Sequence, residues 1–540
     1  MTQHIRLAYP RRKQLLLVAA ILMVQAVLLL FTSAQKQEFH IDEVYSYVIS
    51  NSYDADRVSN ADNLWETWAS GEEYRALTTV QPGEQFAYGT VYRNTSTDCH
   101  PPLYYWMLHT LCSFFPNQFS KWFGLGLNIG LFVIAGFVIF LLSEELFATD
   151  RMKLLPLILY GFSPFAVETV TFIRMYMLLT LLAAAFTLFN VRMLKHGFTR
   201  KRLIASWATI FLGAMTQYYA ILFCFWGVLF FELILLKRRD YKHFLLYGIG
   251  AMASVGLMLL IFPYAIAQAT GTATNNVGNE VVRNLFNVRL WVQMTISLVK
   301  SFATTISYHP PISRLLFLVS AVLLACFAAH TVVARKDTPC RTETLWMLTT
   351  VVFTILSISF VGGEYVYLRY IYSVVPLIYV LSLFALDTLL SGCELLKRVL
   401  VCLLVLFSVG NAALGAVLDK SPYLYKKTYA DDALLSSYRQ YPCFLDVGRT
   451  RWPSVPTGNL TKLSAFESVY MATSEDLLTS NIITDCMNEN DSCVVFVCTD
   501  TYWVEGMEAD DFFRRALPEG CRYTFLCNGH HGQYFLVTRN

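Results

Sequence analysis

Long apolar segments alternate with short polar connections along residues 1–417. Runs of about 17–25 apolar residues are typical of helices that cross a membrane. The pattern predicts about eleven such helices, at 14–33, 120–142, 153–166, 173–192, 203–217, 219–236, 244–266, 312–334, 344–361, 371–390 and 399–417. We therefore expect residues 1–417 to form an all-α polytopic membrane domain.

Lysine and arginine residues are concentrated in alternate connections between these segments. They cluster at 11–13, 192–202, 237–242, 335–341 and 397–398. A count of eleven helices puts all five clusters on one side of the membrane, and short basic connections are typically cytoplasmic. We therefore expect a multi-pass protein of the cell membrane with a cytoplasmic N-terminus. Three long segments then lie on the external side, at 34–119, 267–311 and 418–540.

The apolar pattern changes after residue 417. The segments NDSCVVFVCTD, CRYTFLCNG and GQYFLVTRN are typical of strands, and DDALLSSYRQ and EADDFFRRAL are typical of helices. We expect a small extracytoplasmic α/β domain over residues 418–540. Its six cysteines permit disulfides on an oxidising face of the membrane, and their spacing contains no CxxC zinc motif. The earlier stretch NLFNVRLWVQMTISLVKSF predicts an amphipathic or re-entrant helix.

Composition supports the membrane assignment and narrows the partners. The chain is 55% hydrophobic and 15% charged, whereas soluble proteins are about 45–50% apolar and about 25% charged. A net charge of +3 gives no reason to expect a nucleic acid as partner. The first apolar run has no signal-peptide cleavage site, so we interpret it as an uncleaved helix. The predicted cytoplasmic connections contain no glycine-rich nucleotide-binding loop, which argues against a nucleotide-linked substrate.

Polar residues gather in five segments that this topology places at the external face. Two adjacent acids follow the first helix directly, and the other segments supply histidine, tyrosine and arginine. The candidate site residues are, in chain order, Asp42, Glu43, His100, Tyr104, Arg174, Tyr176, Tyr218, Arg369 and Tyr370. Glu168 and Glu364 belong to the same segments. Ionisable residues at membrane depth are costly and usually functional.

These side chains suit chemistry on a lipid-linked phosphosugar. A carboxylate can take a proton from an attacking hydroxyl, and a guanidinium can hold a phosphate with two hydrogen bonds. The acceptor hydroxyl would attack the anomeric carbon, and the lipid phosphate would leave. Phosphate is already a good leaving group, so no general acid is needed, in contrast to glycoside hydrolysis.

Each candidate also has a structural interpretation. An acidic pair after a helix is typical of a solvated loop. The His-Pro-Pro segment at 100–102 recurs at 309–311 before another apolar run, and proline is favoured in the first turn of a helix. Arg174 near a helix end is typical of a snorkelling side chain, and Tyr218 of an aromatic belt at the membrane interface.

The segments FHIDEVYSYV, HPPLYYW, FIRMYML and YLRYIYSVVPLIYV resemble the signature segments of GT-C fold glycosyltransferases. The resemblance is to protein O-mannosyltransferase-like and aminoarabinose-transferase-like enzymes, and it covers roughly residues 10–420. It implies a polyprenyl-phosphate-linked sugar as donor and Asp42 as the catalytic base, with Glu43 as a supporting residue or second candidate. It also implies that His100 begins a helix beside the site. By the same resemblance, Arg174 with Tyr176 and Arg369 with Tyr370 belong to the donor site.

Two positions depart from the pattern of that family. Phe172 stands where many relatives have a glutamate two residues before the arginine, and Gln217 precedes Tyr218 where relatives often have a histidine. Glu168 is six residues from Arg174 and cannot be its neighbour on a helix. We therefore do not expect Glu168 to replace the missing acid.

The sequence thus predicts an integral membrane glycosyltransferase that moves a hexosyl or pentosyl group. The donor is a polyprenyl-phosphate sugar, the acceptor is a hydroxyl of a glycan, lipid or protein on the outer face, and the transfer inverts the anomeric centre. The alternatives are a lipid-linked sugar flippase or transporter and a surface-polysaccharide polymerase. A transporter would show inverted repeats, and the chain has no halves of matching hydropathy. We expect no cofactor; Asp42 and Glu43 can bind a divalent metal, but no further acid is placed to complete its shell.

Overall fold

The computed structural model describes residues 2–53, 64–270, 287–333, 340–361, 366–418, 421–425, 432–451 and 453–539. The chain divides into two compact units. Unit 1 comprises Met1–Ala34, Asp98–Tyr104 and Leu125–Pro422, and unit 2 comprises Gln35–Thr97, Tyr105–Gly124 and Tyr423–Asn540.

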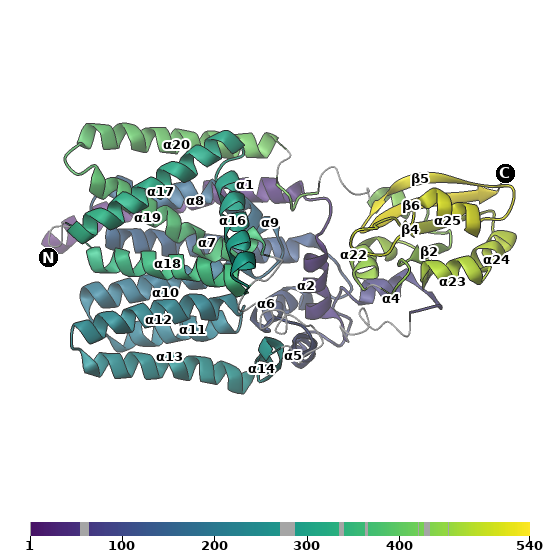
Figure 1. Cartoon of the computed structure of the whole chain (residues 1–540), viewed down its shortest axis with the longest axis horizontal. Helices are drawn as coiled ribbons and strands as arrows, with labels where there is room; N and C mark the ends of the chain where they lie inside the picture. Colours follow the sequence, from purple (N-terminus) through teal and green to yellow (C-terminus); the bar gives the residue numbers. More distant parts are fainter. Residues whose placement is uncertain are drawn as a thin grey trace. The chain divides into compact units, whose positions relative to one another are not determined.

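Unit 1 is a bundle of apolar helices that lie side by side (Figure 1). Its long helices are α1 (Thr2–Ala34), α7 (Lys121–Leu146), α10 (Tyr176–His196), α11 (Arg200–Ala214), α12 (Tyr219–Lys237), α13 (Tyr241–Ile261), α17 (Pro310–Val333), α18 (Arg341–Val361), α19 (Val375–Leu389) and α20 (Glu394–Val417). Shorter elements are α8 (Asp150–Gly161), α9 (Pro164–Thr171), α14 (Tyr264–Thr270), α16 (Val288–Thr305) and the 3-10 helix η1 (Leu368–Val374). Helix α16 confirms a helix within the stretch expected to be amphipathic or re-entrant.

The predicted polytopic membrane domain is confirmed. Within the described residues, nine helices are long and apolar enough to cross a membrane, and ten if the bent pair α8–α9 is one span. The helix axis bends by 53° between the two parts of that pair. Ser163 caps α9 by accepting a hydrogen bond from the N–H of Ala166, and Pro164 occupies the first turn, so α9 starts as a new helix. The remaining predicted segment, 203–217, corresponds to α11, which has 15 residues.

The basic connections of unit 1 gather at one end of the bundle. Figure 1 shows the α10–α11, α12–α13 and α19–α20 connections at the end where the N-terminus lies. The basic clusters at 192–202, 237–242 and 397–398 therefore share one end, as the alternation of the helices predicted. Residues 335–339 of a further cluster lie outside the described residues.

Unit 2 contains a six-stranded sheet in the order β1-β3-β2-β4-β6-β5. The strands are β1 (Trp68–Ala69), β2 (Cys443–Asp446), β3 (Val469–Ala472), β4 (Ser492–Cys498), β5 (Cys521–Gly529) and β6 (Gly532–Arg539). β2 pairs parallel with β3 and β4, and β6 pairs antiparallel with β4 and β5. The helices are α21 (Asp432–Ser436), α22 (Ser454–Leu463), α23 (Ser474–Thr479), α24 (Ile482–Glu489) and α25 (Ala509–Ala516).

The small α/β domain is confirmed, and the predicted strands and helices correspond to β4, β5, β6, α21 and α25. The strands β2 and β3 and the helices α22, α23 and α24 were not predicted. Each of the thirteen cysteines, including the six in this domain, is a free thiol.

Part of the segment 34–119, which was predicted to be external, belongs to the same unit. It forms α2 (Ile41–Asn51), α4 (Gly71–Ala76), α5 (Tyr88–Thr97) and most of α6 (Leu103–Ser113). Strand β1 of this segment pairs antiparallel with β3. Val44 and Val48 of α2 lie in one apolar core with Val455 and Leu460 of α22. The helix that carries the acidic pair is therefore packed directly on the C-terminal α/β fold.

Candidate functional site

Arg174 lies in a short break between α9 and α10. The side-chain amide of Asn128 in α7 donates hydrogen bonds to the carbonyls of Val170 (3.1 Å) and Phe172 (3.0 Å). These bonds hold the carbonyls at the end of α9, where the regular hydrogen bonds of the helix stop. The side chain of Arg174 is 5% exposed. The break is thus a fixed structure that places a buried cation at the end of a membrane helix.

His100 connects Arg174 to Asp98. The Nδ1 atom of His100 lies 2.8 Å from the Asp98 carboxylate, and its Nε2 atom lies 3.3 Å from a terminal nitrogen of Arg174. A neutral ring that donates from Nδ1 to Asp98 and accepts at Nε2 from the guanidinium fits both distances. Burial opposes ionisation of Asp98, but the hydrogen bond from His100 and the charge of Arg174 outweigh it and lower the pKa of Asp98. The chain Asp98–His100–Arg174 therefore orients the guanidinium.

Asp98 and His100 are also residue types that commonly bind metal ions. In the described part of the chain, Asp98, Cys99 and His100 form a group whose ligand atoms lie within 4.8 Å of one another. Asp98 already accepts the hydrogen bond at Nδ1, and the guanidinium of Arg174 lies against Nε2. A cation bound there would be repelled by that guanidinium. The donor set suits a hydrogen-bonded chain better than a divalent metal.

Arg369 lies in η1 among aromatic rings. Its guanidinium carbon is 4.1 Å from the ring centre of Tyr367, 5.4 Å from that of Phe172 and 5.7 Å from that of Tyr370. A cation over the faces of aromatic rings is held by their quadrupoles. The three rings give this guanidinium a defined place while the residue stays partly exposed.

Phe172 lies between the two arginines. Its ring contacts Arg369, and its carbonyl accepts a hydrogen bond from the backbone N–H of Arg174 (2.7 Å). The ring also stacks on Tyr176, with centres 5.9 Å apart. The residue that replaces the expected glutamate thus joins two of the predicted donor-site arginines through apolar and backbone contacts.

Glu168 has a partner that the sequence did not reveal. Its side chain is 8% exposed, and it accepts a hydrogen bond from the hydroxyl of Tyr372 in η1. Tyr372 also packs edge-on against Tyr176 and Phe165. The signal in the sequence was an acid inside an apolar run, but its partner lies 204 residues away. Glu364, the other acid noted in these segments, lies outside the described residues.

The predicted tyrosines fall into two groups. The hydroxyl of Tyr104 donates to the Asn128 side chain (3.3 Å) and is buried, so it supports the break that carries Arg174. The hydroxyl of Tyr218 donates to Gln268. The ring of the adjacent Tyr219 packs against that of Tyr370, with centres 4.9 Å apart. Tyr370 therefore lies beside Arg369, whereas Tyr218 is bonded to Gln268 and Tyr104 has a structural contact.

The acidic pair begins α2 in unit 2. The Glu43 carboxylate accepts hydrogen bonds from the backbone N–H of His40 (2.6 Å) and from the Lys36 ammonium (2.9 Å). The side chains of Lys36 and Glu43 are fully buried. Burial lowers the pKa of Lys36, although the charge of Glu43 opposes this shift. A carboxylate bonded in this way is a weak proton acceptor, so the geometry favours a supporting role for Glu43.

Asp42 has a different environment. Its backbone N–H donates to Nδ1 of His40 (3.1 Å), which completes the cap of α2. Its carboxylate is 27% exposed and lies 3.6 Å from the same imidazole nitrogen. Of the two acids, Asp42 is the one whose carboxylate remains accessible.

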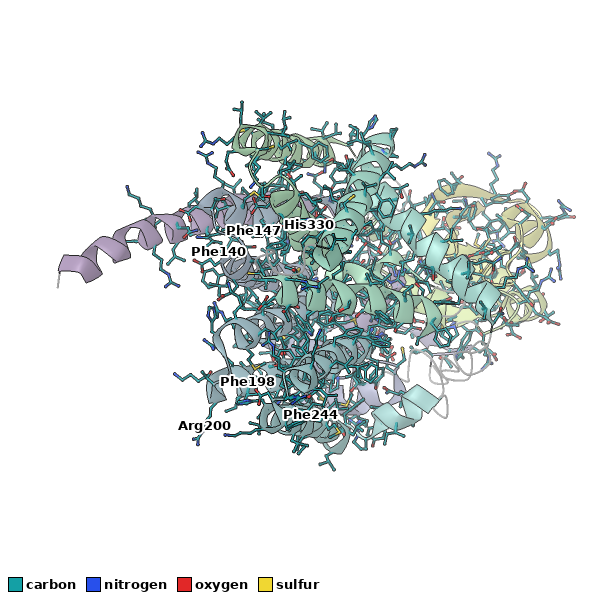
Figure 2. All side chains as sticks on the ribbon, turned by 60° about the vertical axis from the view of Figure 1, so that its left-hand side comes forward. Phe140, Phe147, Phe198, Arg200, Phe244 and His330 are labelled. Atoms are coloured by element: carbon teal, nitrogen blue, oxygen red, sulfur yellow. The ribbon has the colours of Figure 1, made fainter. Side chains whose placement is uncertain are left out.

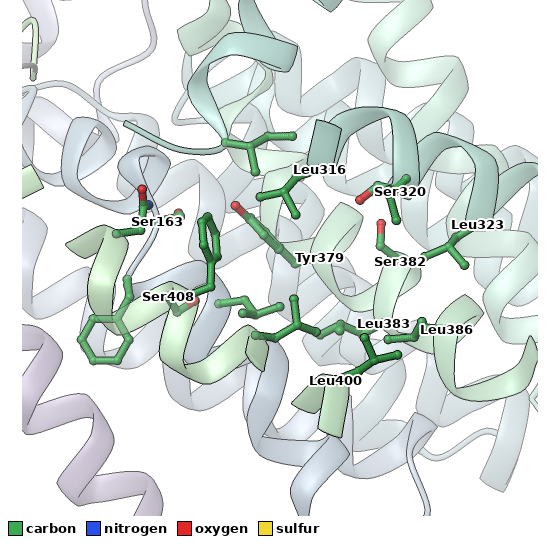
Figure 3. A pocket seen from close by; sticks show the side chains of 17 residues that line it. Ser163, Leu316, Ser320, Leu323, Tyr379, Ser382, Leu383, Leu386, Leu400 and Ser408 are labelled. Atoms are coloured by element: carbon green, nitrogen blue, oxygen red, sulfur yellow. The ribbon is translucent and has the colours of Figure 1, made fainter. Parts of the chain in front are cut away.

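An apolar cavity of ≈ 250 Å³ lies between α8, α17, α19 and α20. Leu316, Leu323 and Leu383 line it together with the hydroxyls of Tyr379 and Ser382 (Figure 3). Ser163, at one edge, is the N-cap of α9, the helix that carries Glu168. The cavity has the lining of a site for a hydrocarbon chain.

Comparison with known proteins identifies the fold. No protein-family model and no curated protein sequence matches this chain. Among solved structures, it is similar to ArnT from Cupriavidus metallidurans bound to undecaprenyl phosphate, with 12% identity and a TM-score of 0.54 over 96% of this chain and 97% of that one. The apo state of that protein gives 12% identity and a TM-score of 0.55 over 98% of both chains.

A second relative in structure is the oligosaccharyltransferase of Archaeoglobus fulgidus in its complex with Zn and sulfate. It has 12% identity and a TM-score of 0.50 over 95% of this chain and 73% of that one. Both proteins have the GT-C fold. The chain described here therefore has the GT-C fold, as its signature segments predicted, and the match includes the C-terminal region that those segments did not reach.

Proposed function

We propose that the protein is an integral membrane glycosyltransferase that moves a sugar from a polyprenyl-phosphate donor to an acceptor hydroxyl. The observation that carries the proposal is the placement of Arg174 and Arg369 on either side of Phe172 in a unit with the GT-C fold. Arginine binds phosphate with paired hydrogen bonds and stays charged in a desolvated site. One structure of similar fold holds undecaprenyl phosphate, which is a ligand of this chemical class.

The reaction is a single displacement in this proposal. The acceptor oxygen forms a bond to the anomeric carbon from the side opposite the phosphate, and the bond between that carbon and the phosphate oxygen breaks. Asp42 takes the proton of the acceptor hydroxyl, and the polyprenyl phosphate leaves with the bonding electrons. Arg174 and Arg369 stabilise the charge that grows on the leaving phosphate. The product has the inverted anomeric configuration.

In this proposal, two tyrosines and the apolar cavity of unit 1 bind the sugar and the lipid chain of the donor. Tyr218 and Tyr370 offer ring faces and hydroxyls to the sugar, and the cavity bounded by Leu316 and Leu383 suits an isoprenoid segment. The basic end of unit 1 faces the cytoplasm by the distribution of lysine and arginine. The arginine site then lies toward the external face, and the acceptor is a glycan, lipid or protein outside the cytoplasm.

The test begins with the donor. Mass spectrometry of lipid-linked sugars in a deletion strain should show one polyprenyl-phosphate sugar that accumulates. Purified full-length protein in nanodiscs is then given that donor. Asp42→Asn should lower transfer at least a hundredfold, the lower range for loss of a general base, while donor binding stays within twofold.

The matched control is Glu72→Gln, which changes an exposed acid of the same unit and should keep full activity. Arg369→Ala should weaken donor binding more than acceptor binding. Near-normal turnover by Asp42→Asn, or movement of the donor across the bilayer without transfer, would contradict the proposal.

A further inference from the structure

One carboxyl group that takes no part in the proposed reaction lies in a groove between α11, α12 and α13. Glu232 belongs to α12 and is 9% exposed. Among the described residues, neither of its carboxylate oxygens has a hydrogen-bond partner. A carboxyl group inside a membrane helix is costly without a partner. The carboxyl group is therefore free to accept a hydrogen bond from a ligand in the groove, as far as the described residues are concerned.

The groove itself is apolar and has a volume of ≈ 860 Å³. It lies between α11, α12 and α13 and extends along α12 from Ile221 to Leu236. The fifteen residue-to-residue steps between them correspond to about 22 Å of helix. The length and the apolar lining of the groove suit a hydrocarbon chain.

Gly248 of α13 makes room for the carboxyl group. A Cβ atom at this position would lie 3.1 Å from an oxygen of Glu232. Gly256 lines the same groove two turns further along, and a Cβ there would meet nothing within 4 Å. The two glycines therefore differ in one respect, which is their distance from the carboxyl group.

The end of the groove nearest Glu232 is basic. The turn between α12 and α13 contains Lys237, Arg238, Arg239 and Lys242. Asp240 in that turn is paired with His243 (2.8 Å), whose ring stacks on Phe198. Figure 2 shows Phe198, Arg200 and Phe244 at this end of the bundle. Glu232 lies five residues before Lys237, or about 7–8 Å deeper along the helix.

We propose that this groove binds a single-chain phospholipid that has a free hydroxyl group beside its phosphate, the class of the lysophospholipids. The hydrocarbon chain fills the groove, the hydroxyl donates to Glu232, and the phosphate meets the basic turn. A diacyl phospholipid has only ester carbonyls at that depth and offers no donor to a carboxylate. Glu232 therefore favours a lysophospholipid, which can donate a hydrogen bond to the carboxylate, over a diacyl phospholipid.

The probes are 1-oleoyl-lysophosphatidate, its 2-O-methyl ether and dioleoyl-phosphatidate, added to purified full-length protein in maltoside micelles. Native mass spectrometry measures the dissociation constant of each. Lysophosphatidate should bind at least tenfold more tightly than the other two lipids. Glu232→Leu should remove this preference, and Glu232→Gln, which still accepts a hydrogen bond, should keep it within threefold.

The glycines give variants that do not depend on removing the carboxyl group. Gly248→Ala should weaken lysophosphatidate binding three- to tenfold, and Gly256→Ala should leave it within twofold; alanine favours a helix over glycine. The proposal is overturned if lysophosphatidate does not bind, or if its methyl ether binds equally well. It is also overturned if native spectra show a dimer that Glu232→Leu disrupts, because the groove would then take a helix of a second copy.

Discussion

The hydroxyl of Tyr372 donates a hydrogen bond to the carboxylate of Glu168 and so ties η1 to α9 inside unit 1. Both residues are buried. Because η1 also carries Arg369 and Tyr370, this contact fixes the element that presents the proposed phosphate ligand. Glu168 and Tyr372 are positioning residues in this view, since neither is assigned to the substrate.

Tyr372→Phe should weaken donor binding. The substitution keeps the ring contacts but removes the hydroxyl that donates to Glu168, which leaves the buried carboxyl group without this hydrogen bond. Loss of one buried hydrogen bond corresponds to about 1–1.5 kcal/mol, so the KM for the donor should rise about tenfold. The kcat should change less than threefold, as measured by steady-state transfer at saturating acceptor.

Substitutions of Glu168 test whether the effect of Tyr372→Phe comes from the lost hydrogen bond. Glu168→Gln keeps an oxygen that can accept from Tyr372, so it should have a smaller effect than Glu168→Leu. Combining Glu168→Leu with Tyr372→Phe should cost little more than either change alone. A fall in kcat with an unchanged KM would mean that the pair does not act through donor binding.

Asp98→Leu should impair the site through His100. Without its acceptor, the ring can carry its proton on Nε2 and present an N–H to the guanidinium of Arg174 in place of a lone pair. We expect donor affinity to fall five- to twentyfold, measured by native mass spectrometry with the identified donor. Glu72→Leu, which changes an exposed acid, is the control and should bind the donor normally. Equal affinities of Asp98→Leu and the parent protein would show that Arg174 needs no orienting chain.

Chelation should leave transfer unchanged. The group formed by Asp98, Cys99 and His100 lies against the guanidinium of Arg174, and Glu43 is bonded to Lys36. Neither set of acids therefore has the character of a divalent metal site. Activity after dialysis against EDTA should stay within about 20% of the activity of the untreated protein. Loss of activity that Mn²⁺ or Mg²⁺ restores would contradict this expectation.

Much of the fold follows from local patterns in the sequence. A membrane helix is specified by its own apolar run, so the segments from 14–33 to 399–417 each correspond to one helix or a bent pair. The bend at Ser163 was not predicted, because it depends on a cap and a proline within a continuous apolar run. Strands β2 and β3 were missed because short, wholly buried strands lack the alternation that marks a half-exposed strand.

The candidate site shows the same limit. The sequence predicted His100, Arg174 and Arg369 as residues of one site, and the structure brings His100 to Arg174 and joins the two arginines through Phe172. The contact between Glu168 and Tyr372 could not be predicted, because it joins positions far apart in the chain and no local pattern encodes such a pairing. The roles of Asp42 and of both arginines remain predictions.

Lys36→Met should destabilise unit 2. Lys36 is fully buried and donates to Glu43 and to the carbonyl of Tyr423. Removal of one partner of a buried ion pair leaves the other charge uncompensated, which costs about 3–5 kcal/mol. The double variant Lys36→Met with Glu43→Gln should recover most of that loss. Chemical unfolding followed by fluorescence of the full-length protein measures both, and equal stability of the single and double variants would contradict the pair's assigned role.

Two buried groups of unit 2 should give opposite responses to acid. Burial lowers the pKa of His530 to about 3, with a further contribution from the charges of His531, His40 and Lys462. The unfolded chain, with a histidine pKa of about 6.5, therefore binds more protons than the native state between these values. Stability from this group is complete above about pH 6.5 and is lost as the pH falls toward 3. Burial raises the pKa of Asp446 to about 6, which has the reverse effect.

The contribution of His530 is isolated by comparison with His530→Gln. Between pH 7 and pH 5, the parent protein should lose about 2 kcal/mol of unfolding free energy relative to this variant. The Asp446 effect is present in both proteins and cancels. Asp446→Asn should show the opposite sign, losing about 1 kcal/mol relative to the parent over the same interval. Parallel pH profiles of the parent and His530→Gln would mean that His530 is protonated in the native state, against the burial of its ring on Gly458.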